Sequence, residues 1–321
     1  MYPVVLLIFG FLLLFLGGEL LVRGSVALAL RMNISTLVVG MTIVSFATSA
    51  PELFVSLQAL FDGRTNIALG NIIGSNITNI TLVLGITAII FRVQISKQTV
   101  RLNYPILLLS SMVFGGVLYY FHGIPQIIGF IFMFCLILFT YLLIKKSRQD
   151  NLSDSVSKDK MFKQAIHDPI YKSIIFLLLA VCMLKYGADN LVDGAIIIAK
   201  NLKVSDRIIA ITFVAIGTSI PELVTSIIAA LKKEDSLAIG NLIGSNIFNI
   251  LAVLGVTASV KEINIDDYAI FSFDYFWMIS ITLILGLLIY VFSKEKVSRK
   301  EGFLLVLIYL FYMYQNLVVV I

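Results

Sequence analysis

Charged residues are scarce in this sequence. Of its 321 residues, 13% are Asp, Glu, Lys or Arg, 59% are hydrophobic, and the mean hydropathy is +1.00. An ordinary soluble domain carries about 25% charged and about 45–50% apolar residues. So few charges cannot cover the surface of a soluble chain of this length. The composition therefore argues against a soluble enzyme, a disordered regulator and a nucleic-acid-binding protein, and it favours a membrane protein.

Cysteine and histidine are equally rare. Cys135 and Cys182 lie in separate apolar runs, without the spacing of a disulfide framework or a metal motif, and we expect them to be buried and inert. His122 and His167 lie in polar breaks, where we expect them to be solvated. An intramembrane hydrolase would need a Ser/His pair or a metal-binding set, which the sequence lacks. We therefore predict neither an enzyme nor a protein with a resident cofactor.

Ten apolar segments separated by short polar breaks fill the chain. They cover approximately residues 3–29, 35–60, 67–90, 104–121, 124–144, 173–199, 207–231, 237–259, 270–292 and 302–320. About 20 apolar residues are enough to cross a bilayer, and a helix satisfies its own backbone hydrogen bonds in lipid. The first segment has no basic region before it and no small-residue cleavage site, so it is expected to be retained. We predict an all-α polytopic membrane protein with ten transmembrane helices.

The basic residues predict an orientation. If the N-terminus lies outside, the inner breaks hold 18 Lys and Arg residues and the outer breaks hold 5. Excess basic charge marks the cytoplasmic side. We therefore expect a multi-pass protein of the cell membrane with both termini outside and a polar cytoplasmic linker at 145–172. Beyond the lipid bilayer, no nucleic acid and no obligate protein partner is predicted.

The two halves of the sequence are related. Residues 40–85 align without a gap with residues 210–255, and 22 of the 46 positions are identical. Because each half holds five predicted spans, the second half should insert upside down. We predict a first inverted repeat over 1–144 and a second over 173–321. Inverted repeats with a site at the bilayer midplane are typical of secondary transporters.

A Thr-Ser-x-Pro-Glu block lies near the middle of the second span of each repeat, at 48–52 and 218–222. Proline leaves the carbonyl four residues earlier without its partner, which lipid-embedded backbone tolerates only beside protein or a polar cavity. On insertion scales, an acidic side chain in the bilayer costs about 2.5–3.5 kcal/mol. The presence of two such residues at repeat-related positions, Glu52 and Glu222, therefore indicates a functional role. The hydroxyls of Thr48, Ser49, Thr218 and Ser219 add oxygen atoms. The alternative is two proline-kinked helices whose glutamates form only structural hydrogen bonds.

A Gly-Asn-x-x-Gly-Ser-Asn block follows in the next span of each repeat, at 70–76 and 240–246. Its glycines, four residues apart, permit close helix packing. Ser75 and Asn79 share a helix face, as do Ser245 and Asn249, and both pairs can direct oxygens toward the carboxylates. The remaining asparagines of these blocks, Asn71, Asn76, Asn241 and Asn246, are equally suited to act as ligands or to form hydrogen bonds between neighbouring helices.

These candidate ligands are all oxygen atoms. Such a set suits hard cations, and Ca²⁺ takes about 6–8 oxygen ligands, whereas zinc and copper favour nitrogen and sulfur. Two carboxylates balance one Ca²⁺ or two Na⁺, so one site could hold either ion in turn. A third Na⁺ would make the exchange electrogenic.

Two charged pairs interrupt the first and sixth spans. Glu19 and Arg23, like Lys185 and Asp189, are four residues apart and are expected to form ion pairs. They could help to gate these two spans, or they could be interfacial charges near the membrane surface.

With both blocks in place, the chain resembles the cation/calcium exchanger superfamily, and most of all its compact prokaryotic sodium/calcium exchangers. The resemblance covers both halves and nearly the whole length. It implies ten helices, alternating access with the first and sixth helices sliding past a fixed core, and Ca²⁺ extrusion driven by Na⁺ entry. By motif position it implies Glu52 and Glu222 as principal ligands. It further implies the backbone carbonyls of Ser45 and Ala215, and a supporting set of Thr48, Ser49, Ser75, Asn79, Thr218, Ser219, Ser245 and Asn249.

The sequence departs from the family pattern at two positions. Ala47 stands where glycine usually precedes Thr48, and Asn249 stands where potassium-dependent relatives carry Asp, which argues against potassium co-transport. The main alternative is a proton-driven Ca²⁺ or broader divalent-cation antiporter on the same scaffold. A cation channel that uses the glutamates as a filter is a different class, and a channel would more often need a symmetric oligomer.

Overall fold

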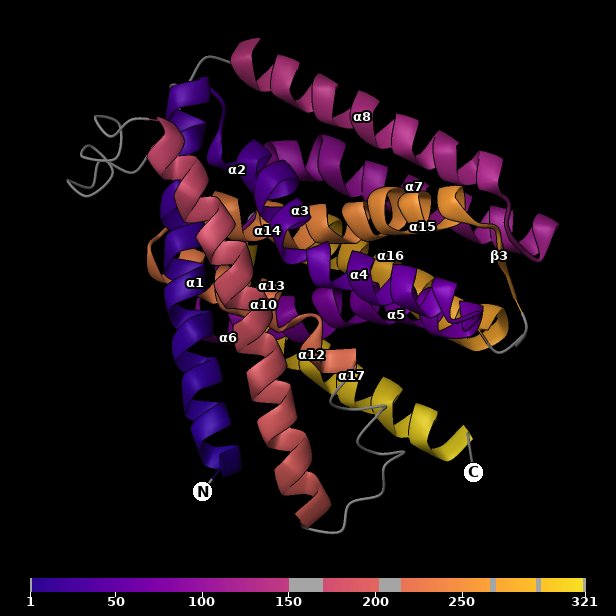
Figure 1. Ribbon diagram of the computed structural model, residues 1–321. Helices are drawn as coiled ribbons and strands as arrows, with labels where there is room; N and C mark the ends of the chain where they lie inside the picture. The colour runs from indigo at the N-terminus through magenta and orange to yellow at the C-terminus, as the bar shows by residue number, and fades with distance from the viewer. Residues whose placement is uncertain (1, 150–169, 202–214, 266–269, 293–295, 320–321) are drawn as a thin grey trace.

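The computed structural model describes residues 2–149, 170–201, 215–265, 270–292 and 296–319 (Figure 1). Within these residues, seven helices are long and apolar enough to cross a membrane, and an eighth is counted when the bent pair Thr36–Thr48 and Ala50–Phe61 is taken as one span. The chain is therefore a helical membrane protein. Most of the predicted linker 145–172 and the start of the predicted span 207–231 lie outside the described residues.

Two long helices, α1 (Tyr2–Met32) and α10 (Ile170–Asn201), lie side by side across one face of the bundle (Figure 1). Small residues recur every seven positions along both of them: Gly10, Gly17 and Gly24 on α1, and Ser173, Ala180, Gly187 and Gly194 on α10. A Cβ atom added at Gly10 would lie 2.8 Å from the Gly187 carbonyl oxygen, which is too close. Small residues therefore let the two backbones approach, the usual basis of helix pairing in lipid.

The second span of the first half is broken. It consists of α2 (Thr36–Val39), the π-helical η1 (Gly40–Val44), α3 (Ser45–Thr48) and, after a 42° bend at Ser49, α4 (Ala50–Phe61). Pro51 explains the break, because its ring nitrogen has no hydrogen to continue the helix. In the second half, α12 (Ala215–Gly217) and α13 (Ile220–Leu231) flank the corresponding break before Pro221.

The other helices form the rest of the bundle. In the first half they are α5 (Thr65–Thr78), η2 (Asn79–Val83), α6 (Leu84–Ile90), η3 (Thr99–Asn103), α7 (Tyr104–Phe121) and α8 (Gln126–Gln149). In the second half they are α14 (Asp235–Phe248), η5 (Asn249–Leu254), α15 (Gly255–Val260), η6 (Ile270–Tyr275), α16 (Phe276–Leu287), η7 (Leu288–Phe292) and α17 (Arg299–Val319).

The two halves contact each other through matching pairs of interactions. Strands β1 (Val93–Gln94) and β4 (Lys296–Val297) pair antiparallel, and so do β2 (Gly123–Ile124) and β3 (Ile263–Asn264). The Tyr104 hydroxyl donates to the Thr282 carbonyl at 3.0 Å, and the Tyr275 hydroxyl donates to the Ser111 carbonyl at 3.1 Å. The two strand pairs are related to each other by a shift of about 170 residues, and so are the two tyrosine bonds. The element that the first half contributes to one contact is contributed by the second half to the related contact.

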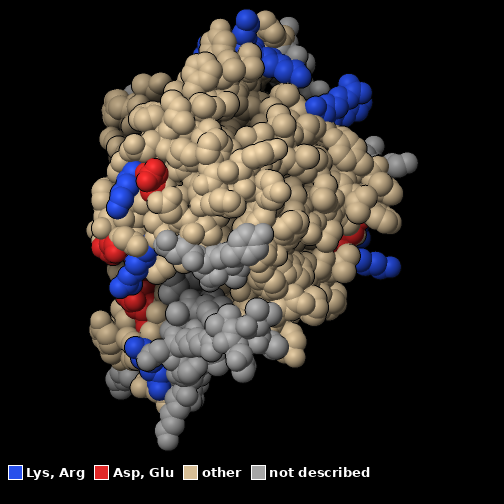
Figure 2. All heavy atoms as spheres, turned by 90° about the vertical axis from the view of Figure 1, so that its right-hand side faces the viewer, with Lys and Arg blue, Asp and Glu red and all other residues tan. Residues whose placement is uncertain are grey.

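The outer surface is largely apolar. Figure 2 shows a face whose middle carries almost no charge, with Lys and Arg toward its edges. Large exposed side chains include Phe130 and Phe134 of α8 and Leu178 of α10. The expectation that Cys135 and Cys182 are buried is wrong, because both are exposed on α8 and α10. In a membrane protein an apolar run can face lipid, so apolar sequence does not by itself indicate burial.

Candidate cation-binding site

Both broken helices restart inside the protein, and each carries a glutamate in its first turn. Glu52 lies at the start of α4 and Glu222 at the start of α13, and both side chains are fully buried. The first N–H groups of a helix lack intrahelical partners and carry partial positive charge, so this position favours a carboxylate. Proline produces the helix start and thereby places each glutamate beside these N–H groups.

The two blocks meet at one place. The Ser49 hydroxyl, three residues before Glu52, donates to Oε1 of Glu222 at 3.3 Å. Residues 173 positions apart in the sequence thus share one buried polar region. The structure brings the two predicted carboxylates together, which the sequence could suggest only through the repeat.

The first broken helix is bound to α14 by a small hydrogen-bonding cluster. The Thr48 hydroxyl lies 3.2 Å from Oδ1 of Asn241 and 3.3 Å from the Ser245 hydroxyl. The Ser45 hydroxyl donates to the Gly40 carbonyl at 2.7 Å and to the Asn241 carbonyl at 3.2 Å. Gly240 allows α14 to approach the first broken helix this closely, because a Cβ at this position would lie 2.5 Å from the Leu37 carbonyl oxygen.

The asparagines that begin the second blocks join neighbouring helices. Nδ2 of Asn71 donates to the Glu52 carbonyl at 3.1 Å and to the Ser56 hydroxyl at 3.0 Å. Nδ2 of Asn241 donates to the related Ser226 hydroxyl at 3.3 Å. Interhelical bonding is therefore confirmed for these two asparagines, and Asn71 also bonds the backbone of a candidate ligand. Asn76 and Asn246 instead donate to the Ile72 and Leu242 carbonyls of their own helices, at 2.8 and 2.7 Å.

Many buried side-chain atoms of the predicted ligand set have no protein partner. Among the described residues, buried side-chain atoms without a hydrogen bond include both carboxylate oxygens of Glu52, Oε2 of Glu222, the hydroxyls of Ser75, Thr218 and Ser219, and the amides of Asn79 and Asn249. Buried polar atoms in native proteins are nearly always bonded. Such a set of unpartnered oxygens has the chemistry that a hard cation requires.

The two halves of the site differ. Thr48 and Ser49 of the first half are hydrogen-bonded to α14 and to Glu222, whereas the related hydroxyls of Thr218 and Ser219 have no such bonds within the described structure. Ala215 begins α12, directly after the residues that are not described. Carbonyl ligation by Ser45 and Ala215 stays a prediction.

A cavity of about 560 Å³ lies beside the less bonded half of the site. Its lining includes Pro51 and Thr218 and three exposed charged residues: Asp62 after α4, and Lys185 and Asp189 of α10. The cavity therefore connects the region of the glutamates with charged residues at the protein surface.

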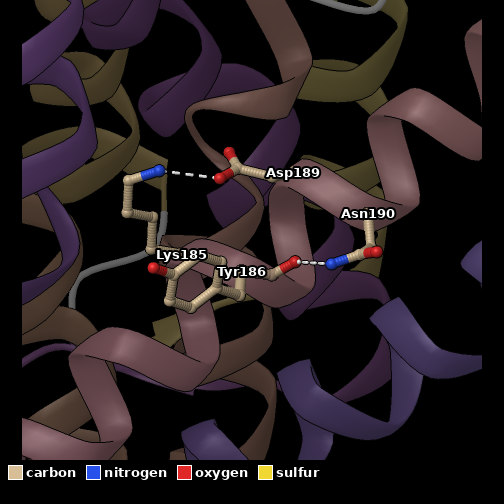
Figure 3. A network of polar contacts seen from close by, with 4 residues as sticks. All are labelled: Lys185, Tyr186, Asp189 and Asn190. Atoms are coloured by element: carbon tan, nitrogen blue, oxygen red, sulfur yellow. Dashed lines mark hydrogen bonds and ion pairs between the residues drawn. The ribbon is translucent and has the colours of Figure 1, made fainter.

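One of the two predicted ion pairs is present. Nζ of Lys185 lies 2.7 Å from Oδ2 of Asp189 along α10, while Asn190 turns away to bond the Tyr186 carbonyl (Figure 3). The predicted pairing of Glu19 with Arg23 is wrong.

Glu19 binds a lysine of another helix instead. Its Oε1 atom lies 2.6 Å from Nζ of Lys232, whereas the Arg23 guanidinium lies over the Phe176 ring at 5.8 Å. Spacing along one helix could not reveal this partner from α13.

Sequence reasoning missed one further buried acid, Glu234, in the turn between α13 and α14. Its side chain is 3% exposed, and its Oε1 atom has no hydrogen bond within the described structure. Burial, followed by the nearby charge of Asp235, raises the pKa of Glu234 from its usual 4.5 to about 7. The Lys-Lys-Glu-Asp turn reads as solvent-exposed in the sequence, so only the packing identifies this residue.

An apolar helical bundle with two repeat-related acids at broken helices defines a polytopic membrane protein of the transporter type. A family model described as sodium/calcium exchanger protein matches residues 2–145 and 172–318. The chain therefore belongs to the sodium/calcium exchanger family.

Individual relatives match over nearly the full length. Inner membrane protein YrbG of Escherichia coli (strain K12) is 34% identical over 303 residues, covering 94% of this chain and 92% of the relative. Sodium/calcium exchanger MaX1 of Methanosarcina acetivorans is 27% identical over 340 residues, covering 95% of each. The solved structure of the sodium-calcium exchanger NCX_Mj, soaked with Na⁺ and Ca²⁺, superposes with a TM-score of 0.80 at 29% identity and covers 98% of each chain.

Proposed function

We propose that this protein is a secondary antiporter that exchanges Na⁺ for Ca²⁺ at one buried all-oxygen site. The observation that carries the proposal is the buried pair Glu52 and Glu222, with Ser49 of the first block bonded to Glu222 and with further buried, unpartnered oxygens in the same sequence blocks. Two carboxylates can neutralise one Ca²⁺ or two Na⁺, so competition for the same charges couples the ions. A third Na⁺ would make the exchange electrogenic.

The proposed ligands are those that the sequence identified. Glu52 and Glu222 supply charge, and neutral oxygens come from Thr48, Ser49, Ser75, Asn79, Thr218, Ser219, Ser245 and Asn249, with backbone carbonyls at Ser45 and Ala215. The unpartnered oxygens support this assignment. The relatives named as sodium/calcium exchangers, MaX1 and NCX_Mj, support the choice of ions.

We further propose ten membrane-crossing helices in two inverted repeats, 1–144 and 173–321, with both termini outside and 145–172 cytoplasmic. The reciprocal strand pairs and tyrosine bonds support the inverted arrangement. In this orientation the cavity beside Glu52 opens to the outside. Ion binding would allow the bundle to close this side and open the other.

A proton-driven Ca²⁺ or broader divalent-cation antiporter is the second candidate, because the same glutamates could carry protons. The test is ⁴⁵Ca²⁺ uptake into proteoliposomes loaded with Na⁺, with K⁺ or with a pH gradient. Uptake that depends on internal Na⁺ supports Na⁺/Ca²⁺ exchange, and uptake that follows only the pH gradient would replace it with proton exchange. Conductive Ca²⁺ flux without a counter-ion would indicate a channel.

The glutamates are tested by Glu52→Gln and Glu222→Gln, each of which keeps shape and removes charge. Loss of one partner from a buried charged site costs about 3–5 kcal/mol, so Ca²⁺ affinity should fall by more than about a hundredfold. The matched control is Glu262→Gln, a change at an exposed residue between α15 and β3, which should leave exchange unchanged. Wild-type Ca²⁺ binding in either site variant would reject its role as a ligand.

A further inference from the structure

The helices that carry the two glutamates in their first turns, α4 and α13, are packed differently against the long pair α1 and α10. On α13, Ile228 is 3% exposed and faces α1, where a Cβ at Gly18 would lie 2.5 Å from its Cδ1 atom. One turn farther along, Lys232 binds Glu19 at 2.6 Å, and the two side chains are 17% and 32% exposed. The α1–α13 side of the site is therefore tightly closed.

The repeat predicts the corresponding contact on the other side. Adding or subtracting 170 converts Gly18 to Ala188 and Glu19 to Asp189 on α10, and Ile228 to Gln58 and Lys232 to Asp62 on α4. All four of these residues line the cavity of about 560 Å³, and both Gln58 and Asp62 are exposed. The α4–α10 side is therefore open where the α1–α13 side is closed.

Charge differs between the two sides in the same way. The closed side joins opposite charges, Glu19 and Lys232. If α10 approached α4 as α1 approaches α13, Asp189 would move toward Asp62. The contact would then bring two negatively charged carboxylates together. Like charges forced together oppose contact, whereas opposite charges favour it.

We propose that this charge difference sets the resting conformation: the Glu19–Lys232 ion pair holds the α1–α13 side shut, and the Asp62–Asp189 repulsion holds the α4–α10 side open. The inference rests on the proposed exchange between two open states, and it assigns positioning roles to residues outside the ion site. Lys185, bound to Asp189 at 2.7 Å, offsets part of the repulsion, so closure of the open side stays possible.

The test measures which side is accessible, independently of which ions are carried. In a Cys135→Ala/Cys182→Ala background, a single cysteine replaces either Gln58 or Ile228, the related positions on α4 and α13. The protein is placed in lipid nanodiscs, where both faces meet the solution, and labelling by a charged maleimide is followed over time. We expect rapid labelling of the Gln58→Cys protein and slow labelling of the Ile228→Cys protein.

Removal of the ion pair should shift the balance. With Lys232→Met, the ratio of the Gln58→Cys rate to the Ile228→Cys rate should fall roughly fivefold, the upper range for a partly exposed pair. The charge exchange Glu19→Lys/Lys232→Glu should restore the ratio. With Asp62→Lys, which offers Asp189 an opposite charge, the ratio should again fall, although Lys232 is intact.

Each alternative result has a definite meaning. An unchanged ratio in Lys232→Met overturns the role of the ion pair, and an unchanged ratio in Asp62→Lys overturns the role of the repulsion. Faster Ile228→Cys labelling with no slowing at Gln58→Cys and no recovery on charge exchange shows local loosening, which also overturns the proposal. Sodium-dependent Ca²⁺ uptake by the same variants, reconstituted into proteoliposomes, separates these outcomes from a failure of the proposed function.

Discussion

The close contact between the first broken helix and α14 gives a sharp test of how the site is built. Gly240→Ala would place a Cβ 2.5 Å from the Leu37 carbonyl oxygen and 3.2 Å from the Met41 nitrogen. The related change Gly70→Ala meets nothing within 4 Å. The two substitutions are chemically identical and occupy equivalent positions of the repeat, so each is the control of the other.

The structure fixes the expected size of the effect. Ordinary van der Waals contact begins near 3.4 Å, so the helices at Gly240 would have to separate by roughly 0.9 Å. Overpacking of this kind costs about 1–3 kcal/mol. The separation would also lengthen the 3.2 Å contact between Thr48 and Asn241. Gly70→Ala should be neutral or slightly stabilising, because alanine favours a helix by about 1 kcal/mol over glycine.

Thermal unfolding in detergent and sodium-dependent ⁴⁵Ca²⁺ exchange measure the two consequences. Gly240→Ala should lower the unfolding temperature and the exchange rate, while Gly70→Ala should lower neither. Equal losses in both variants would refute the reasoning that this contact positions Thr48 at the site.

Three further predictions concern single interactions. Glu234→Gln should raise the free energy of unfolding at pH 8 by about 1 kcal/mol after allowance for solvent screening. The raised pKa of about 7 means that Glu234 stabilises the fold in full below about pH 4.5 and loses this contribution as the pH rises to about 7; melting curves at pH 4.5 and 8 should therefore agree with wild type only at the lower pH. Asn71→Leu leaves the buried Glu52 carbonyl without its donor, which costs about 1–3 kcal/mol, and calorimetric titration should show weaker Ca²⁺ binding. Tyr104→Phe and Tyr275→Phe each remove one hydroxyl–carbonyl bond worth about 1 kcal/mol; clearly unequal melting temperatures would contradict equivalent roles for the two halves.

The helical membrane fold could be predicted because its causes are local. Runs of apolar residues specify spans, and proline at positions 51 and 221 predicts where two of them break. The structure confirms the break before Pro51 with a 42° bend. The exposure of the two cysteines could not be predicted, because apolar residues face lipid as readily as protein.

The acids of the candidate site were also predictable, because a charge within an apolar run is conspicuous and the repeat doubles the signal. Their surroundings were not. That Ser49 bonds Glu222 rather than a residue of its own half depends on how the two repeats interlock. The burial of Glu234 in a turn of charged residues depends on packing in the same way.

The sequence alone thus determined the residue types of the candidate site and their duplication, because motif spacing and composition can be read directly from the sequence. Only the tertiary structure decided which residues touch across the halves. Glu19 binds Lys232, directly after α13, rather than Arg23 one turn away on its own helix. The related Asp189 lies instead beside an open cavity, which Asp62 also lines. The physical reason is that helices far apart in the chain approach only where small residues and complementary charges permit it. Two nearly equivalent halves can therefore pack differently, one closed and the other open.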